Sequence, residues 1–156
     1  MVGRDGLREL DRRFVEDDLR DLRRLVTAHL RLLGVPAERA AELVVVANEL
    51  ACNAAQHGGG GGRLRLWPDG PVVRCEVSDG GPGFAQPDGV GRVRPAPTAG
   101  GGRGLWLARQ LCDDVTVRNT AAGAVVNAGM LVDPGYRRAR RGAWSVRREG
   151  ARTGSC

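Results

Sequence analysis

Apolar and polar residues recur along the chain with two different periods, which separate the expected helices from the expected strands. Residues 19–33 place leucine and valine every three or four positions, the spacing of one buried helix face. Residues 37–57 repeat this spacing over a longer stretch. Gly34 and Pro36 stand between the two segments, and helices favour glycine just after the end and proline at the start. We therefore expect two consecutive amphipathic helices.

Shorter segments alternate apolar and polar residues with period two and predict strands. They are residues 64–67, 72–78, 115–118 and 124–132. The turn sequence Pro-Asp-Gly-Pro at 68–71 predicts a hairpin between the first two, and the turn around 121–123 joins the last two. Residues 6–14 also alternate, so they form either a short edge strand or an extended arm. Five glycines at 58–62 are expected to end the second helix and form a flexible link to the first of these strands.

Three polar residues of the second predicted helix form a column. Glu49, Asn53 and His57 follow one another at intervals of four, so they lie one above another on one face. Glu49 can accept a proton or orient a water, and the Asn53 carbonyl oxygen can bind a hard cation such as Mg²⁺. The column alone favours a solvated stripe on an amphipathic helix over a site. His57 is expected to pack against or cap the helix end, with a catalytic role as the alternative.

Two glycine-rich segments change that interpretation towards a site. Asp79 directly follows a predicted strand, and Gly81 and Gly83 come next. A carboxylate there can accept a hydrogen bond from an exocyclic amine such as that of adenine, beside glycines that let a flat base approach. About twenty residues rich in Gly, Pro and Arg follow, and a loop of that length is usually functional. It leads to a helix predicted at 105–113.

That third helix opens with a glycine pair that suits phosphate groups. Gly102 and Gly104 flank Arg103, and a helix N-terminus offers unpaired N–H groups to an anion. Arg103 either reaches a terminal phosphate or is a solvated loop residue. With the preceding loop as a lid, these parts predict an ATP site in which Mg²⁺ bridges Asn53 and the phosphates.

Composition excludes several other mechanisms. All 24 basic residues are Arg, so Walker-A phosphate loops, Schiff-base chemistry and the strand lysine of eukaryotic-type protein kinases are excluded. The segment from Gly135 to Cys156 holds seven Arg and one Glu and accounts for the whole net charge of +6. The body is thus neutral and carries no nucleic-acid footprint. We expect residues 1–133 to form one domain and residues 134–156 a basic, disordered tail, either inert or an interaction arm.

Cysteine spacing and the N-terminus suggest the cellular setting. The four cysteines are scattered without a C-x-x-C pair, which argues against a zinc site and for a reducing, cytosolic environment. The charged N-terminus lacks the apolar stretch of a secretory signal, and no apolar run is long enough to cross a bilayer. The sequence therefore predicts a cytoplasmic protein without a membrane partner.

Three motifs in order resemble a known superfamily. The stretches N-E-L-A-C-N-A-A-Q-H-G, D-G-G-P-G and G-G-R-G-L-W-L-A resemble the three nucleotide-binding boxes of the GHKL ATPases, which include gyrase and the histidine kinases. The short chain and the form of the first box resemble, within that superfamily, the anti-sigma-factor serine kinases. This resemblance covers roughly residues 7–132. It implies a two-layer α/β sandwich with helices over one face of a mixed, largely antiparallel sheet.

The resemblance also implies roles for individual residues. Glu49 would be the catalytic base that activates an acceptor serine, and Asn53 would coordinate Mg²⁺. Asp79 would bind the adenine amine. Glycines would line the two ends of ATP. Gly81 and Gly83 would lie at the adenine, and Gly102 and Gly104 at the phosphates. The chain departs from the family where Ala124 follows Gly123, a position at which relatives often carry Thr, so a water-mediated contact to the base is in question.

Two functions from different classes remain open on this basis. The first is an ATP-dependent serine kinase of the anti-sigma type, whose partners would be a sigma factor and a STAS-type anti-anti-sigma protein. The second is a non-catalytic module that holds ATP and gates a protein-binding surface. Nucleic-acid binding through the arginine tail is a weaker third possibility. The resemblance also makes a homodimer possible.

Overall fold

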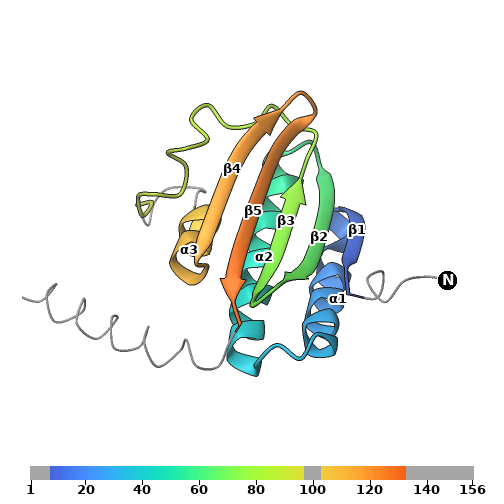
Figure 1. Cartoon of the computed structure of the whole chain (residues 1–156). Coiled ribbons are helices and arrows are strands. Elements are labelled where there is room, and N and C mark those ends of the chain that lie inside the picture. Colours follow the sequence, from blue (N-terminus) through green and yellow to red (C-terminus); the bar gives the residue numbers. More distant parts are fainter. Residues whose placement is uncertain (1–7, 97–102, 133–156) are drawn as a thin grey trace, which may run out of the picture.

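The computed structural model describes residues 8–96 and 103–132, and this part of the chain forms two layers. A sheet of five strands lies in front of three helices in Figure 1, and all three helices cover the same face of the sheet. The elements in chain order are β1 (Leu10–Val15), a 3-10 turn (Glu16–Asp18), α1 (Leu19–Leu32), α2 (Ala37–His57), β2 (Gly61–Asp69), β3 (Val72–Ser78), α3 (Arg103–Leu111), β4 (Asp114–Thr120) and β5 (Gly123–Leu131).

The sheet order is β1-β2-β3-β5-β4, and every neighbouring pair is antiparallel. The predicted α/β sandwich with helices on one face is confirmed. The expectation of a mixed sheet is wrong for the described residues, because no parallel pair occurs among them. Both predicted hairpins are present, and β1 pairs with β2 as an edge strand. That pairing decides between the strand and the arm expected for this segment.

The glycine run is shorter as a linker than its composition predicts. Gly61 and Gly62 belong to β2 and pair with Val15 and Phe14 of β1. An added Cβ at Gly61 would collide with the Phe14 carbonyl, and one at Gly62 with the Ser78 carbonyl. These two glycines therefore let β1, β2 and β3 approach one another closely. The connection from α2 to β2 consists of residues 58–60.

The two long helices bury the faces that their sequence period predicts. In α1 the buried residues are Leu22, Val26 and Leu30. Gly34 follows the end of the helix, and its φ of 73° lets the Val35 N–H donate to the Leu30 carbonyl. In α2 the buried residues include Leu43, Val46, Leu50 and Ala54.

The start of α1 has no side-chain cap, although Asp18 stands at the capping position. The Asp18 carboxylate accepts a hydrogen bond from the Val15 N–H, 3.0 Å away, and makes no cap bond to α1 itself. The carboxylate thus bonds back to the last residue of β1, across the 3-10 turn.

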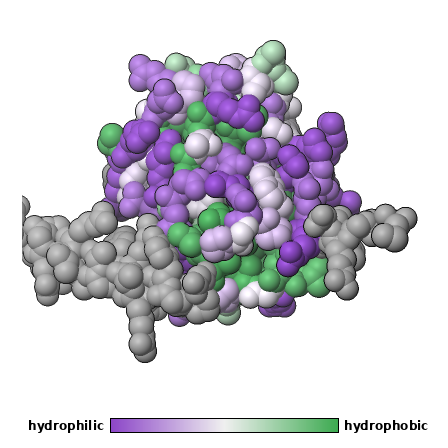
Figure 2. Space-filling model, in the orientation of Figure 1, coloured by the Kyte–Doolittle hydropathy of each residue, from purple (hydrophilic) through white to green (hydrophobic). Residues whose placement is uncertain are grey.

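The core lies between the helices and the inner face of the sheet. Its strand residues alternate with period two, and they are Phe14, Leu64, Leu66, Val73, Cys75, Val77, Val117, Val126, Ala128 and Met130. The opposite face is mostly hydrophilic (Figure 2). No helix within residues 8–96 or 103–132 is long and apolar enough to cross a membrane.

Candidate nucleotide site

A cavity of about 580 Å³ lies between α2, the ends of β3 and β5, the start of α3 and the loop that follows β3. Most of its lining is apolar, with a few polar side chains, which is the usual composition of a small-molecule site. It is lined by Leu50, Asn53, Ala54, Gln56, His57, Val77, Asp79, Pro82, Gly83, Phe84, Val90, Leu105, Ala124 and Val126. Asn53 and Asp79, predicted from separate motifs, therefore share one cavity.

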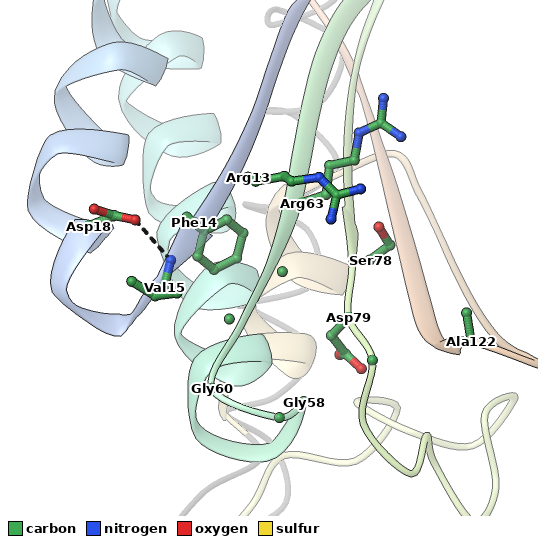
Figure 3. Close-up of a pocket in the computed structure, with 14 residues that line it drawn as sticks. Arg13, Phe14, Val15, Asp18, Gly58, Gly60, Arg63, Ser78, Asp79 and Ala122 are labelled. Atoms are coloured by element: carbon green, nitrogen blue, oxygen red, sulfur yellow. Dashed lines mark hydrogen bonds between the residues drawn. The ribbon is translucent and has the colours of Figure 1, made fainter.

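Asp79 is held at the end of β3 by the backbone of two other segments. Its Oδ1 accepts hydrogen bonds from the N–H of Gly81 (2.9 Å) and of Ala124 (3.3 Å), and its own N–H donates to the Ala124 carbonyl (3.0 Å). The carboxylate points towards Gly58 at the end of α2 (Figure 3). No hydrogen bond within the described residues uses Oδ2, so this oxygen can accept a bond from a ligand.

The departure at Ala124 is thereby compensated in part. The Ala124 side chain cannot hold a water as a threonine hydroxyl would. Its backbone N–H and carbonyl nevertheless fix the position and orientation of Asp79. The carboxylate is thus positioned without the side chain that relatives often carry.

Glu49 and Asn53 lie further along the same helix, one turn apart. At 1.5 Å per residue, Asn53 lies about 7 Å and Glu49 about 13 Å from Gly58 along the helix axis. Both side chains are half-buried, and neither forms a hydrogen bond or ion pair with any residue in the described ranges. A carboxylate and a carboxamide thus remain available for a ligand on the face of α2 that carries the cavity.

Gly104, the second residue of α3, lies against the polar side chains of α2. A Cβ on this buried residue would lie 3.1 Å from the Asn53 Nδ2, from the Glu49 Cβ and from the Glu49 Oε2. Glycine therefore lets the first turn of α3 pack directly against the two polar side chains. The N–H groups of that turn come close to Glu49 and Asn53 as a consequence.

The loop after β3 is attached to the domain at several points. The Phe84 N–H donates to the Asn119 Oδ1 (2.9 Å), and the Asn119 Nδ2 donates to the Phe84 carbonyl (2.7 Å). The Arg109 Nε donates to the Val90 carbonyl (2.9 Å). Burial lowers the pKa of Arg109 and nearby Arg92 adds to this effect. Phe84 and Val90 both pack against the core, so the loop forms one wall of the cavity.

The remaining predicted residues are distributed around this cavity. Gly83 lines the cavity and has a φ of 77°, a backbone conformation that residues with a side chain rarely adopt. Gly81 packs against the end of α2, and His57 is exposed at the cavity margin. Arg103 is exposed as the first residue of α3. Gly102 lies outside the described residues.

Sequence reasoning did not identify the apolar wall or the loop attachments. Leu50, Val77 and Val126 carry ordinary core periodicity, so nothing in the sequence separates them from other buried residues. Asn119 and Arg109 lie 35 and 19 residues from their partners, and no local pattern links them. Within the described ranges, no group of three or more His, Cys, Asp and Glu side chains could hold a metal ion.

Comparison with known proteins identifies the family. Residues 15–130 match the model of the histidine kinase-like ATPase domain. Curated protein sequences give no match. A crystal structure of the RsbU and RsbW domains of Rv1364c from Mycobacterium tuberculosis is similar, with a TM-score of 0.59 and 19% identity over 78% of this chain. The chain spans 32% of that protein's length, about a third, so the likeness concerns the fold. Because the family model covers most of the chain, the protein belongs to the family of histidine kinase-like ATPase domains, which implies that it binds ATP.

Proposed function

We propose that the protein is an ATP-dependent serine kinase of the anti-sigma-factor type. It would transfer the terminal phosphoryl group of ATP to a serine of an anti-anti-sigma partner. It would also sequester a sigma factor, and so act as a switch between the two partners. The observation that carries the proposal is the placement of Asp79 and Asn53 in one cavity of about 580 Å³, with Glu49 one helical turn further on.

The base and the phosphates of the nucleotide would lie at different points along α2. The adenine would fill the apolar part of the nucleotide cavity, and its exocyclic amine would donate a hydrogen bond to the Asp79 carboxylate. Its phosphates would extend towards Asn53 and the first turn of α3, where the Arg103 side chain and the backbone N–H groups would bind them. The Asn53 carbonyl oxygen would hold Mg²⁺ together with phosphate oxygens and water, which suits a site without a carboxylate cluster. The cation would neutralise phosphate charge.

Glu49 would act as the general base of the transfer. The serine Oγ forms a bond to the terminal phosphorus as the bond from that phosphorus to the ADP oxygen breaks. The serine proton passes to the Glu49 carboxylate, and ADP leaves. The half-buried Glu49 side chain has no described partner, so it is free to approach a serine hydroxyl.

Calorimetry and phosphotransfer can separate these roles. We expect Asn53→Ala and Asp79→Asn to weaken Mg-ATP binding by about tenfold or more, because the first removes the proposed Mg²⁺ ligand and the second the charged acceptor of the adenine amine. Asn48→Ala is the matched control on the same helix, since among the described residues Asn48 hydrogen-bonds to Cys52 Sγ alone and does not line the nucleotide cavity. Glu49→Gln should bind ATP normally and lose about a hundredfold or more of the transfer rate to STAS-domain proteins.

The outcomes distinguish the two functions left open by the sequence. ATP binding without transfer to any candidate, with Glu49→Gln behaving like the wild type in cells, would favour the nucleotide-gated binding module. A wild-type chain that binds no ATP would remove both proposals.

A further inference from the structure

The outer side of the helix layer carries a surface that the nucleotide proposal does not use. α1 and α2 are joined by residues 33–36 and pack against each other, and Figure 1 shows both behind the sheet. Arg23 of α1 and Asn48 of α2 line the same narrow cavity, so they mark where the two helices meet. Residues on the same helix faces continue the surface in both directions, and they are Arg20, Thr27 and Arg31 on α1 and Ala41, Val45 and Cys52 on α2. We call this set, with Arg23 and Asn48, the α1–α2 surface.

The α1 side of this surface is positively charged. A hollow of about 430 Å³ is lined by Arg20, Arg23, Arg24, Thr27, Ala28 and Arg31, and no acidic side chain lines it. Four Arg and one Asp give α1 a net charge of +3, which already includes Asp21 and its pair with Arg24. The side chains of Arg20, Arg23 and Arg31 form no hydrogen bond or ion pair with any described residue.

Acidic groups gather at one end of the surface. The 3-10 turn Glu16–Asp18 precedes α1, where acidic side chains favour the helix dipole. Burial raises the pKa of the Cys52 thiol and the Glu49 and Glu16 carboxylates add to this, which places both near the same end. Residues 23–31, by contrast, hold three Arg and no acidic residue. The positive stretch therefore extends for about 12 Å along the axis of α1.

The α2 side of the surface is uncharged and partly apolar. Ala41 is exposed and Val45 is 38% exposed. Among the described residues, the Asn48 side chain hydrogen-bonds to Cys52 Sγ alone. These four residues follow one another at intervals of three or four, so they form one row on α2. A basic row and an uncharged, partly apolar row thus lie side by side.

We propose that the α1–α2 surface docks an amphipathic helix of a partner protein, with carboxylates about two turns apart on Arg23 and Arg31 and apolar side chains on Ala41 and Val45. Acidic residues on one face of a helix repeat every three or four positions, as these arginines do, so the two rows can run alongside each other. None of these residues lines the nucleotide cavity, and the inference goes beyond the proposed function.

Other occupants fit this surface less well. The apolar face of α1, which comprises Leu22, Val26 and Leu30, is buried in the core and so is not available for insertion into a lipid surface. A nucleic acid would use the arginines but leave the α2 row without a partner. Within this chain, residues 135–156 hold seven Arg and one Glu, and Glu42 of α2 is already paired with Arg39. Neither supplies a free acidic row.

A fluorescent alanine-based peptide of about 16 residues tests the proposal by fluorescence anisotropy at low ionic strength. Its helix carries one row of glutamates and a neighbouring row of leucines. We expect the wild-type chain to bind it and Arg23→Gln/Arg31→Gln to weaken binding by about tenfold, the scale of two exposed charge pairs. Val45→Gln should weaken binding by about threefold, because apolar contact is lost. A peptide with lysines in place of the glutamates should bind Arg23→Glu/Arg31→Glu better than the wild type.

Each variant has a matched control. Arg13→Gln/Arg118→Gln removes the same charge from the outer face of the sheet, which no helix covers in Figure 1. Arg13 lies opposite Arg63, and the row through Arg63 ends at Arg118 of β4. Leu32→Gln is the control for Val45→Gln. Leu32 is 72% exposed and lies nine residues after Arg23, which places it on about the opposite side of α1.

The proposal would be overturned by no binding to the wild type, or by equal losses in the two arginine double variants. It would also be overturned if a peptide of the same composition, with its glutamates spread around the helix, bound equally well, because charge alone would then suffice. Tighter binding of duplex DNA or phosphatidylserine vesicles would assign the surface to that ligand instead. Loss of self-association in Arg23→Gln/Arg31→Gln, measured by sedimentation without peptide, would assign it to a second copy. Asn53→Ala should bind the peptide normally, so a failure of the nucleotide proposal would leave this result intact.

Discussion

At the scale of single residues, the contact of α3 with the polar side chains of α2 depends on the absence of one side chain. Gly104 is buried against Glu49 and Asn53, with each of the three nearest atoms 3.1 Å from where a Cβ would stand. A methyl group there would push apart α3 and the two residues proposed for phosphate and serine chemistry. The close approach therefore connects packing directly to the site.

Gly104→Ala should weaken Mg-ATP binding by about tenfold or more while changing the free energy of unfolding by only about 1 kcal/mol, since alanine favours the helix as it crowds the site. Isothermal titration calorimetry and urea unfolding measure the two effects. Gly89→Ala is the control, because a Cβ there meets its nearest atom at an ordinary 3.7 Å. Equal affinities for Gly104→Ala and wild type would show that the contact has no role in nucleotide binding.

Two core cysteines link single residues to the pH dependence of stability. Burial raises the pKa of Cys112 from 9.0 to about 12, with nearby Asp113 contributing, and burial also raises the pKa of Cys75. Folding therefore favours the neutral thiols. Their contribution to stability is complete below pH 9 and declines as the pH rises above it, because only the unfolded chain then releases their protons.

The free energy of unfolding should thus fall above pH 9, by up to about 1.4 kcal/mol per pH unit for each thiol. Urea unfolding at pH 7, 9 and 10 measures the slope. A Cys75→Ala/Cys112→Ala double variant should be less stable than the wild type at pH 7. Its free energy of unfolding should fall less steeply as the pH rises above 9. Parallel slopes in the two proteins would assign the alkaline loss to other groups.

At the scale of elements, the loop after β3 is a wall of the cavity because strands and helices hold it. The side chain of Asn119 exchanges two hydrogen bonds with the backbone of Phe84, in the manner of a neighbouring strand. Arg109 of α3 holds Val90, and its NH1 also donates to the Val115 carbonyl (3.0 Å). The loop is thereby coupled to both α3 and β4.

Asn119→Ala should release this loop without unfolding the domain. Amide hydrogen exchange is expected to accelerate at residues 83–92 and to stay unchanged in α2. The loss of two hydrogen bonds should lower the local opening free energy by about 1–3 kcal/mol. Thr116→Ala on the exposed face of the same strand is the control. Unchanged exchange at residues 83–92 would mean that Phe84 packing alone holds the loop.

At the scale of the whole molecule, one buried arginine joins the helix layer to the sheet layer at the end opposite Asp79. The Arg39 side chain, 7% exposed, donates to the Leu131 carbonyl (2.9 Å) and pairs with Glu42 (2.8 Å) and Asp113 (3.2 Å). The Leu131 N–H also donates to Asp113, at 2.7 Å. The start of α2, the end of β5 and the segment after α3 meet in this network.

Arg39→Met should lower the free energy of unfolding by about 3 kcal/mol, because it leaves buried acceptors without their cation. Arg24→Met provides the comparison. Its side chain is 76% exposed and its pair with Asp21 is 3.7 Å long, so we expect a change below about 0.5 kcal/mol. Similar midpoints in urea for both variants would argue that the Arg39 network adds no net stability.

Much of the architecture and part of the site could be predicted because they depend on local periodicity and turn chemistry. The two long helices and both hairpins belong to this group, as do the positions of Asn53 on a helix and of Asp79 just after a strand. The extension of β2 to Gly61 could not be predicted, because it depends on two neighbouring strands that approach those glycines. Asn119, Arg109 and Arg39 were likewise not identifiable, since their partners lie far away in sequence.

The sequence by itself determined where the two long helices and both hairpins lie, which of their faces are apolar, and which polar residues are candidates for a nucleotide site. Those properties follow from side-chain period, from Gly and Pro at the element ends and from the chemistry of each motif. Only the tertiary structure decided the strand order, the antiparallel pairing throughout, the apolar wall of the cavity and the row that sets Arg13 beside Arg63. These features come from contacts between segments distant in the chain, whose free energy no local pattern records.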